Sequence, residues 1–336
     1  MAVVFPWLPG SDAAWSSFEA HLDAFTHISP TGLAFRPDGS IAQADRPDLT
    51  KVTQIAKDHQ LLVLPLIVNE NFQAQSAEAV LCDKTVRQRA IDELARLVEA
   101  NQWDGINLDF EGPWAYRSQY VAFVSGISKR LHDLGKLVTV DVVSAYRPPR
   151  GVEGDPGLSW SDPYDYPALG QLVDLFILMG YDYHYRFGHP GPVGPAWWLE
   201  RVLDWTTSVV PSHKVVLGLP FYGYHWTVTE AGETVDGAYL PFAEAERLRC
   251  EHRVWRAWDW DGLSRYFHFR EPDQPNVEHI VHYDDAASLA QRMQLISRYH
   301  LAGVAFWSLG QEDPDVWSFV KKQIKGAEST ASPAQA

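Results

Sequence analysis

Polar side chains that could move protons recur in one short segment, Asp-Gly-Ile-Asn-Leu-Asp-Phe-Glu at residues 104–111. If this segment is a strand, the alternation of its faces places Asn107, Asp109 and Glu111 together on one side. Burying two carboxylates costs on the order of several kcal/mol unless they are paired or hydrogen-bonded. The spacing therefore predicts a site for acid–base chemistry with Glu111 as proton donor. The alternative is a solvated strand end with incidental acids.

The elements that must position this face alternate regularly. Short apolar runs predict eight strands, and helical periodicity lies between several of them, as at 87–101, 116–134, 197–209 and 288–299. The strands are expected at residues 3–8, 25–33, 61–68, 105–111, 137–144, 175–181, 215–222 and 304–309. This order predicts an α/β fold, a (β/α)8 TIM barrel, with Ile106, Leu108 and Phe110 facing the helices. An open doubly wound sheet is the alternative, although no Gly-rich phosphate loop follows any predicted strand.

A small insertion is expected in the barrel, because the seventh and eighth strands lie too far apart for a single crossover. The catalytic barrel would span residues 1–324, with an α+β subdomain at about 227–282 that holds a helical stretch (241–251) and two strand-like runs (266–270, 279–283). Its Trp255, Trp258 and Trp260 form either a small core or a wall for stacking sugars. The small, polar residues 325–336 are expected to be a disordered tail.

The overall charge limits the possible partners. A formal net charge of -15 over 336 residues argues against nucleic acid and anionic membrane surfaces. No stretch is long and apolar enough to span a bilayer, and no signal peptide is visible. The compartment therefore stays open between the cell envelope or exterior, if a leader has been removed, and the cytoplasm. We expect a monomer.

No metal or cofactor site is predicted. The two cysteines, Cys82 and Cys250, can form neither a disulfide framework nor a cysteine metal site. His184 and His189 beside Asp182 match no zinc signature, and the Asp-Trp-Asp-Gly run at 259–262 lacks the remaining ligands of a calcium loop. The expected chemistry therefore needs no metal or cofactor.

The segment 104–111 closely resembles the D-x-x-D-x-D-x-E signature of glycoside hydrolase family 18, the chitinase-like hydrolases. Three further segments resemble motifs of that family in the right order: Met179-Gly-Tyr-Asp182, Leu217-Gly-Leu-Pro-Phe-Tyr222-Gly and Gly303-Val-Ala-Phe-Trp307. The resemblance covers about residues 3–320. It is closest to the bacterial spore-cortex-lytic N-acetylglucosaminidase branch, through Gly188-His-Pro-Gly-Pro-Val, His282-Tyr-Asp-Asp and Gly310-Gln-Glu-Asp. The LysM modules that many members carry are not present in the sequence.

This resemblance implies a retaining hydrolase in which the substrate's 2-acetamido group, rather than a second carboxylate, attacks the anomeric carbon. Glu111 would act as general acid and then base, while Asp109 would hydrogen-bond the acetamido N–H. Tyr181 would donate to the acetamido oxygen with support from Asp182. Further contacts with the sugar are implied for Trp307 (the apolar floor), Tyr222 (the cleft wall), Met179 and Asn107. Read singly, the aromatic residues could be core and Asp182 a loop cap.

The sequence departs from the commonest family pattern in two places. Asn107 stands where many chitinases have an Asp, so we expect its amide to orient Asp109 and the pH profile to lack a separate transition from an acid pair. Burial with Asp109 and Asp182 nearby should raise the pKa of Glu111. In the third strand, Asn69 and Glu70 replace a Ser-x-Gly-Gly pattern and are interpreted as loop polarity. Asp104 has the wrong parity for the interior and is expected to anchor backbone at the strand start.

The predicted function is hydrolysis of β-1,4-linked N-acetylglucosamine glycans, either peptidoglycan or chitin-type. The partner would be a carbohydrate that bears N-acetyl groups. Two alternatives stay open: a non-catalytic carbohydrate-binding protein on the same barrel, and an endo-acting enzyme on N-glycan cores. The presence of both Asp109 and Glu111 favours the enzyme.

Overall fold

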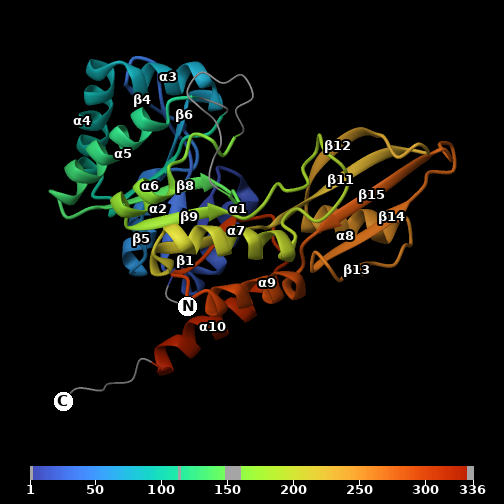
Figure 1. Ribbon diagram of the computed structural model, residues 1–336. Coiled ribbons are helices and arrows are strands. Elements are labelled where there is room, and N and C mark those ends of the chain that lie inside the picture. The colour runs from blue at the N-terminus through green and yellow to red at the C-terminus, as the bar shows by residue number, and fades with distance from the viewer. Residues whose placement is uncertain (1–2, 113–114, 148–159, 331–336) are drawn as a thin grey trace.

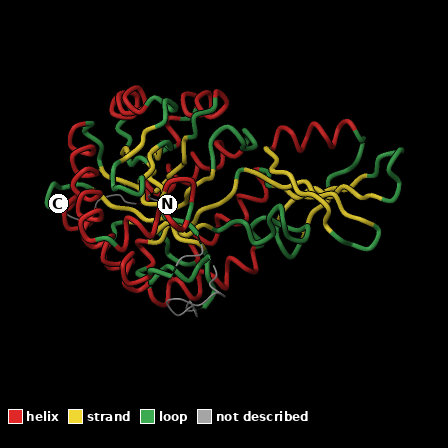
Figure 2. Tube along the Cα trace, turned by 90° about the horizontal axis from the view of Figure 1, so that it is seen from above, coloured by secondary structure: helices red, strands yellow, loops and turns green. Residues whose placement is uncertain are grey.

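The computed structural model describes residues 3–112, 115–147 and 160–330, with the backbone alone described for 324–330. A ring of parallel strands forms its centre, and helices surround the ring (Figures 1 and 2). In order around the ring the strands are β1 (Val3–Leu8), β2 (His27–Pro30), β5 (Leu62–Val63) with β6 (Leu66–Asn69), β7 (Gly105–Asp109), β8 (Leu137–Val143), β9 (Leu175–Met179), β10 (Val215–Pro220) and β16 (Gly303–Trp307). Since β16 pairs with β1, the ring closes and the predicted TIM barrel is confirmed.

Two of the predicted strands are interrupted. The run at 25–33 forms β2 and then β3 (Leu33–Phe35), which also pairs with the short antiparallel β4 (Ile41–Gln43). The run at 61–68 divides into β5 and β6 around Pro65, which has no N–H to give to a sheet. Single hydrogen bonds to each neighbouring strand bridge the break: the Leu64 amide donates to the Ile28 carbonyl, and the Asn107 amide donates to the Pro65 carbonyl.

The helices that cover the barrel are α1 (Asp12–Ala20), α2 (Leu49–Asp58), α3 (Ala74–Cys82), α4 (Lys84–Ala100), α5 (Arg117–His132), α6 (Tyr166–Leu172), α7 (Ala196–Val209), α9 (Ala286–Arg298) and α10 (Val316–Thr330), with 3-10 turns at Leu22–Ala24, Glu70–Phe72 and Ser212–Lys214. Acidic caps start several of them. Asp83 accepts from two amides at the beginning of α4, and Asp285 forms a capping box with Ser288 at α9. The helix α10 continues into the segment 325–336 that we expect to be disordered; 331–336 lie outside the described residues.

The predicted alternation of β7 is confirmed by burial. Ile106, Leu108 and Phe110 belong to the large core between strands and helices. Asn107 and Asp109 point the other way and are 0% and 3% exposed. The interior they enter is otherwise packed with apolar residues, among them Phe5, Trp7, Leu66, Ile177 and Val216. Polar side chains therefore occupy positions that a barrel normally fills with branched apolar groups.

A second sheet projects from the barrel at one side (Figure 1). It contains β11 (Tyr222–Thr229), β12 (Thr234–Pro241), β13 (Ala257–Asp259), β14 (Ser264–Phe269) and β15 (Val277–Tyr283), all antiparallel, with α8 (Phe242–Glu251) on one face. Leu240, Phe267, Val281 and Tyr283 form its core beneath α8. The sheet starts at Tyr222, immediately after β10, and so extends beyond the 227–282 expected from the sequence.

Candidate active site

The main chain at Glu111 is fixed from two neighbouring strands. Glu111 follows the end of β7, and Asn69 lies at the end of β6 beside it. The Asn69 amide nitrogen donates to the Glu111 carbonyl at 3.1 Å, and its oxygen accepts from the Glu111 amide at 2.9 Å. The hydroxyl of Tyr164 donates to the carbonyl of Phe110 at 2.7 Å. Glu111 therefore starts from a rigid backbone although it stands outside regular structure.

A second buried carboxylate, Asp141 on β8, lies in the barrel interior and is 1% exposed. The Asn107 amide nitrogen donates to Asp141 Oδ2 at 2.9 Å, and Thr139 donates to the Asn107 oxygen at 2.7 Å. The expectation that Asn107 orients Asp109 is thus corrected, because the amide holds Asp141. Asp109 Oδ1 has no hydrogen-bond partner among the described residues.

The electrostatics of these acids follow from burial and mutual repulsion. Burial, with the Asp182 carboxylate nearby, raises the pKa of Glu111 to about 7. Burial, then Glu111 and Asp141, raise the pKa of Asp109 well above its ordinary value. Burial raises the pKa of Asp141 as well, although the hydrogen bond from Asn107 opposes that shift. Near neutral pH the half-buried Glu111 can hold a proton and release it, as a general acid must.

Asp182 lies next to Tyr181, just beyond β9, in a left-handed conformation with φ 61°. Its Oδ1 accepts hydrogen bonds from the hydroxyl of Tyr222 at 2.6 Å and from that of Tyr224 at 3.0 Å. The expected support of Tyr181 by Asp182 is therefore absent among the described contacts. The hydroxyl of Tyr222 binds Asp182. Because Tyr222 is only 2% exposed, its ring does not form the cleft wall that the sequence predicts. Burial raises the pKa of the Tyr181 phenol, which keeps it a hydrogen-bond donor.

Trp307 ends β16 at the same face of the barrel. Its ring packs edge to face on Trp7 of the interior, with centroids 5.6 Å apart, and it remains partly exposed. Met179 ends β9, is 7% exposed, and its carbonyl accepts from the hydroxyl of Ser144 at 2.5 Å. The carboxyl ends of β7, β9 and β16 thus bring the sequence-predicted residues to one face, the face on which TIM-barrel active sites lie.

A cleft of about 610 Å³ opens at this face. Its lining includes Glu111, Met179, Tyr181 and Asp182 together with exposed aromatic rings, of which Trp160 is 49% and Tyr185 46% exposed. This volume lies in the range of small-molecule sites, and apolar rings beside a few polar groups suit pyranose faces.

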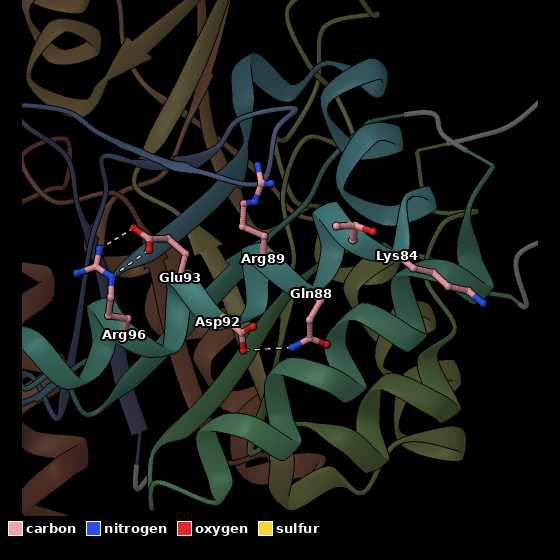
Figure 3. Close-up of a pocket in the computed structure, with 7 residues that line it drawn as sticks. Lys84, Gln88, Arg89, Asp92, Glu93 and Arg96 are labelled. Carbon is pink, nitrogen blue, oxygen red and sulfur yellow. Dashed lines mark hydrogen bonds and ion pairs between the residues drawn. The ribbon is translucent and has the colours of Figure 1, made fainter.

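Another hollow, of about 680 Å³, lies against the outer side of α4 (Figure 3). Two pairs form among its lining side chains: Arg96 binds Glu93, and Gln88 donates to Asp92 at 3.2 Å. None of its lining residues is aromatic, and it lies on the helical surface rather than at the strand ends. The cleft around Glu111 is therefore the candidate active site.

Among the described residues no group of three or more His, Cys, Asp or Glu side chains is arranged to hold a metal ion. None of the described helices is both long and apolar enough to cross a membrane.

Asn69, Asp141 and Tyr224 are site residues that the sequence reasoning missed. Asp141 shares the alternating pattern of Thr139 in the run Leu-Val-Thr-Val-Asp-Val-Val at 137–143, so the parity argument used for β7 would have found it. Tyr224 continues the alternation of Tyr222 along β11. No local signal distinguishes Asn69 from an ordinary loop residue, because its role depends on which strand lies beside it.

Comparison with known proteins places the chain among glycosidases. The model of the family "Glycosyl hydrolases family 18" matches residues 11–312. The chain is 28% identical to the uncharacterized glycosylase YvbX of Bacillus subtilis, over 94% of this chain and 90% of that protein. It is 24% identical to the cortical fragment-lytic enzyme of B. subtilis, over 91% of this chain and 69% of that protein. A crystal structure of a chitinase from Chromobacterium violaceum superposes with a TM-score of 0.84 at 24% identity, covering 96% of this chain and 98% of that one. The chain belongs to glycosyl hydrolase family 18 and is a glycosidase related to the spore cortex-lytic enzymes.

Proposed function

We propose that this glycosidase cleaves β-1,4 bonds in N-acetylglucosamine-containing glycans with retention, using the substrate's acetamido group as nucleophile. The observation that carries the proposal is the position and acidity of Glu111. It lies at the cleft on a clamped backbone, with a pKa raised to about 7. A carboxyl group that is protonated near neutrality suits proton donation to a leaving oxygen.

In this mechanism the Glu111 proton passes to the glycosidic oxygen as the bond from that oxygen to C1 breaks. The acetamido carbonyl oxygen forms the new bond to C1, giving an oxazolinium ion. Asp109 accepts the acetamido N–H and balances the positive charge, and Tyr181 donates to the acetamido oxygen. Glu111, now a carboxylate, takes a proton from water, whose oxygen attacks C1 from the face the leaving group occupied and restores the acetamido group.

The buried environment of Asp109 supports this role. Its Oδ1 carries no hydrogen bond within the described residues, so it keeps an unused acceptor that the acetamido N–H of a bound substrate would satisfy. Trp307, packed on Trp7, would form the apolar floor under the reacting sugar. Among substrates we favour peptidoglycan, because the curated relatives include cortical fragment-lytic enzymes.

The test is hydrolysis of peptidoglycan glycan strands and of chitin oligomers by the wild-type chain and by Glu111→Gln. We expect the variant to lose at least about a thousandfold in kcat while it still binds both glycans, because the amide keeps the shape and loses the proton. Glu70→Gln, on the neighbouring strand end, is the matched control. Equal, slow release of reducing sugar by wild type and Glu111→Gln would favour a carbohydrate-binding protein.

Two readouts address the nucleophile. De-N-acetylated oligomers should resist cleavage, because they lack the acetamido carbonyl. The first product seen by NMR should be the β-anomer. Rapid cleavage of the de-N-acetylated oligomer, or a first product in the α form, would contradict substrate assistance.

A further inference from the structure

One side of the cleft is the segment between β9 and α7, and the projecting sheet fixes its main chain. The indole N–H of Trp226 donates to the carbonyl of Tyr185 at 3.2 Å, and the hydroxyl of Thr234 donates to the carbonyl of Gly188 at 3.1 Å. At Gly237 of β12, an added Cβ would lie 2.0 Å from the carbonyl oxygen of Arg186. The strand backbone therefore touches the segment directly, and the segment is a fixed surface.

This surface presents an aromatic ring and a cation to the cleft. Phe187 is 72% exposed, and the guanidinium carbon of Arg186 lies 4.4 Å from the centroid of its ring. Arg186 is the only Lys or Arg among the described residues that line the cleft. Stacking on the ring restricts the guanidinium and leaves its edge N–H groups free to donate.

Arg186 has no acidic partner in the described parts of the chain, although the chain carries a net charge of -15. Some other exposed arginines pair with carboxylates, as Arg298 does with Glu200 and Arg96 does with Glu93. An unpaired guanidinium at the edge of a substrate cleft is available for an anionic group of the ligand.

The guanidinium does not act on the reacting carboxyl group. The raised pKa of Glu111 has burial and Asp182 as its causes, and Arg186 is not among them. A cation close to Glu111 would lower that pKa. Arg186 therefore does not set the acidity of Glu111.

We propose that Arg186, stacked on Phe187, binds a carboxylate on a sugar adjacent to the cleaved bond, of the kind that the 3-O-lactyl group of N-acetylmuramic acid carries. The proposal rests on the hydrolase function above and names its substrate class. Arginine offers two parallel N–H donors that match the two oxygens of a carboxylate. The enzyme then prefers glycan strands with free lactyl carboxylates over strands in which that group is neutral.

The test compares kcat/KM on three substrates: peptide-free glycan strands with free lactyl carboxylates, the same strands with those groups converted to amides, and neutral chitin oligomers. We expect wild type to favour the free carboxylate over its amide by about tenfold, as a charged hydrogen-bonded pair allows. Arg186→Gln should abolish that preference by raising KM for the strands with free carboxylates. Arg186→Lys should keep part of it, since the charge remains and the fork is lost.

Arg201→Gln is the matched control. Arg201 is exposed and lies over the ring of Trp197 at 5.5 Å, so the variant removes the same charge and a similar stacked pair outside the cleft. The wild-type ratio should persist in this variant and should shrink as salt is added. An equal ratio in wild type and Arg186→Gln would overturn the proposal, as would an equal loss in Arg201→Gln.

Binding measurements distinguish the proposal of this subsite from the hydrolase proposal. Calorimetry with Glu111→Gln and with Glu111→Gln/Arg186→Gln measures affinity for the free and amidated strands without turnover. Compared with Glu111→Gln, the double variant should bind strands with free carboxylates about tenfold more weakly. The two variants should bind the amidated strands equally well. If wild type cleaves none of the glycans but this difference appears, the hydrolase proposal fails and the subsite stands. If strands that still bear peptides bind tightly and peptide-free strands do not, the carboxylate recognised belongs to the peptide and the lactyl assignment is overturned.

Discussion

Asn69 binds both main-chain polar atoms of Glu111, donating to its carbonyl at 3.1 Å and accepting from its amide at 2.9 Å. This pair of bonds joins the ends of β6 and β7 and is buried, since Asn69 is 0% exposed. The side chain expected to transfer the proton is thereby aimed by an amide on the neighbouring strand.

Asn69→Ala should lower kcat by roughly 10- to 100-fold with little change in KM, because a small displacement of Glu111 spoils proton transfer. It should also reduce the free energy of unfolding by about 1–3 kcal/mol, since three backbone groups, two of Glu111 and the carbonyl of Gln73, lose their partner. Steady-state kinetics and urea unfolding measure the two effects. Glu70→Gln is the control, as Glu70 faces Arg36 at 4.0 Å. A kcat for Asn69→Ala equal to that of the control would contradict the role.

The pH dependence of kcat should fall on the alkaline side near pH 7, because Glu111 must be protonated to act and its pKa is raised to about 7. Asp182→Asn removes one cause of that shift, so the alkaline limb should move to lower pH. Rate profiles of both proteins between pH 4 and 9 measure the limb. An unchanged limb in Asp182→Asn, with kcat still measurable, would show that Asp182 does not set the acidity of Glu111.

The stability difference between Glu111→Gln and wild type should depend on pH. A carboxyl group whose pKa is raised on folding binds more protons in the folded state, so wild type loses stability as pH rises from about 4.5 to about 7. The amide does not titrate. The melting temperature of the variant should therefore exceed that of wild type at pH 8, and the difference should shrink at pH 4.5. A difference independent of pH would point to packing and not to the charge.

Asn107→Asp should destabilise the barrel more at pH 8 than at pH 5. The new carboxyl group would face Asp141, which now accepts from the Asn107 amide at 2.9 Å. Burial and repulsion would raise its pKa, so the cost appears as pH rises above the pKa of the unfolded chain. Thermal melts at the two pH values, with Asn107→Ala for comparison, measure this. Equal losses at both pH values would argue against a charge effect.

A buried ion pair joins the exit of the projecting sheet to α9. Arg292, 0% exposed, binds Asp284 and also donates to the carbonyl of Leu263 at 3.2 Å. Arg292→Met should cost about 3–5 kcal/mol of unfolding free energy, because it leaves Asp284 buried without its cation. The double variant Arg292→Met/Asp284→Leu should recover most of that loss in denaturant unfolding. Additive losses would show that the two charges are independent.

Much of the barrel could be predicted because its signal is local. The eight strand positions and the facing of Ile106, Leu108 and Phe110 follow from apolar runs and alternation. The sequence predicts neither the break at Pro65 nor the break between β2 and β3. An apolar run that contains a single proline does not show whether the strand continues on the other side of it. The predicted insertion starts at residue 227, whereas the projecting sheet starts at Tyr222. The difference arises because the alternating residues from Tyr222 resemble the end of the seventh predicted strand.

The contacts within the site could not be predicted, because they depend on register between strands. Val68 pairs with Asp109, and this alignment brings Asn69 beside Glu111. Asp182 accepts hydrogen bonds from Tyr222 and Tyr224, and these two tyrosines belong to a different sheet. Sequence motifs identify which residues gather at the strand ends, but not which of them bind one another.

The projecting sheet is anchored at its base and exposed at its tip. At the base, the ring of Phe221 stacks on Phe306 at 4.4 Å and its amide donates to the carbonyl of Trp307 at 2.8 Å. At the tip, residues 230–233 are exposed, and an added Cβ on Gly232 would meet nothing within 4 Å. The hairpin tip is therefore a natural attachment point, where a foreign peptide or a binding module could be inserted without disturbing the cleft.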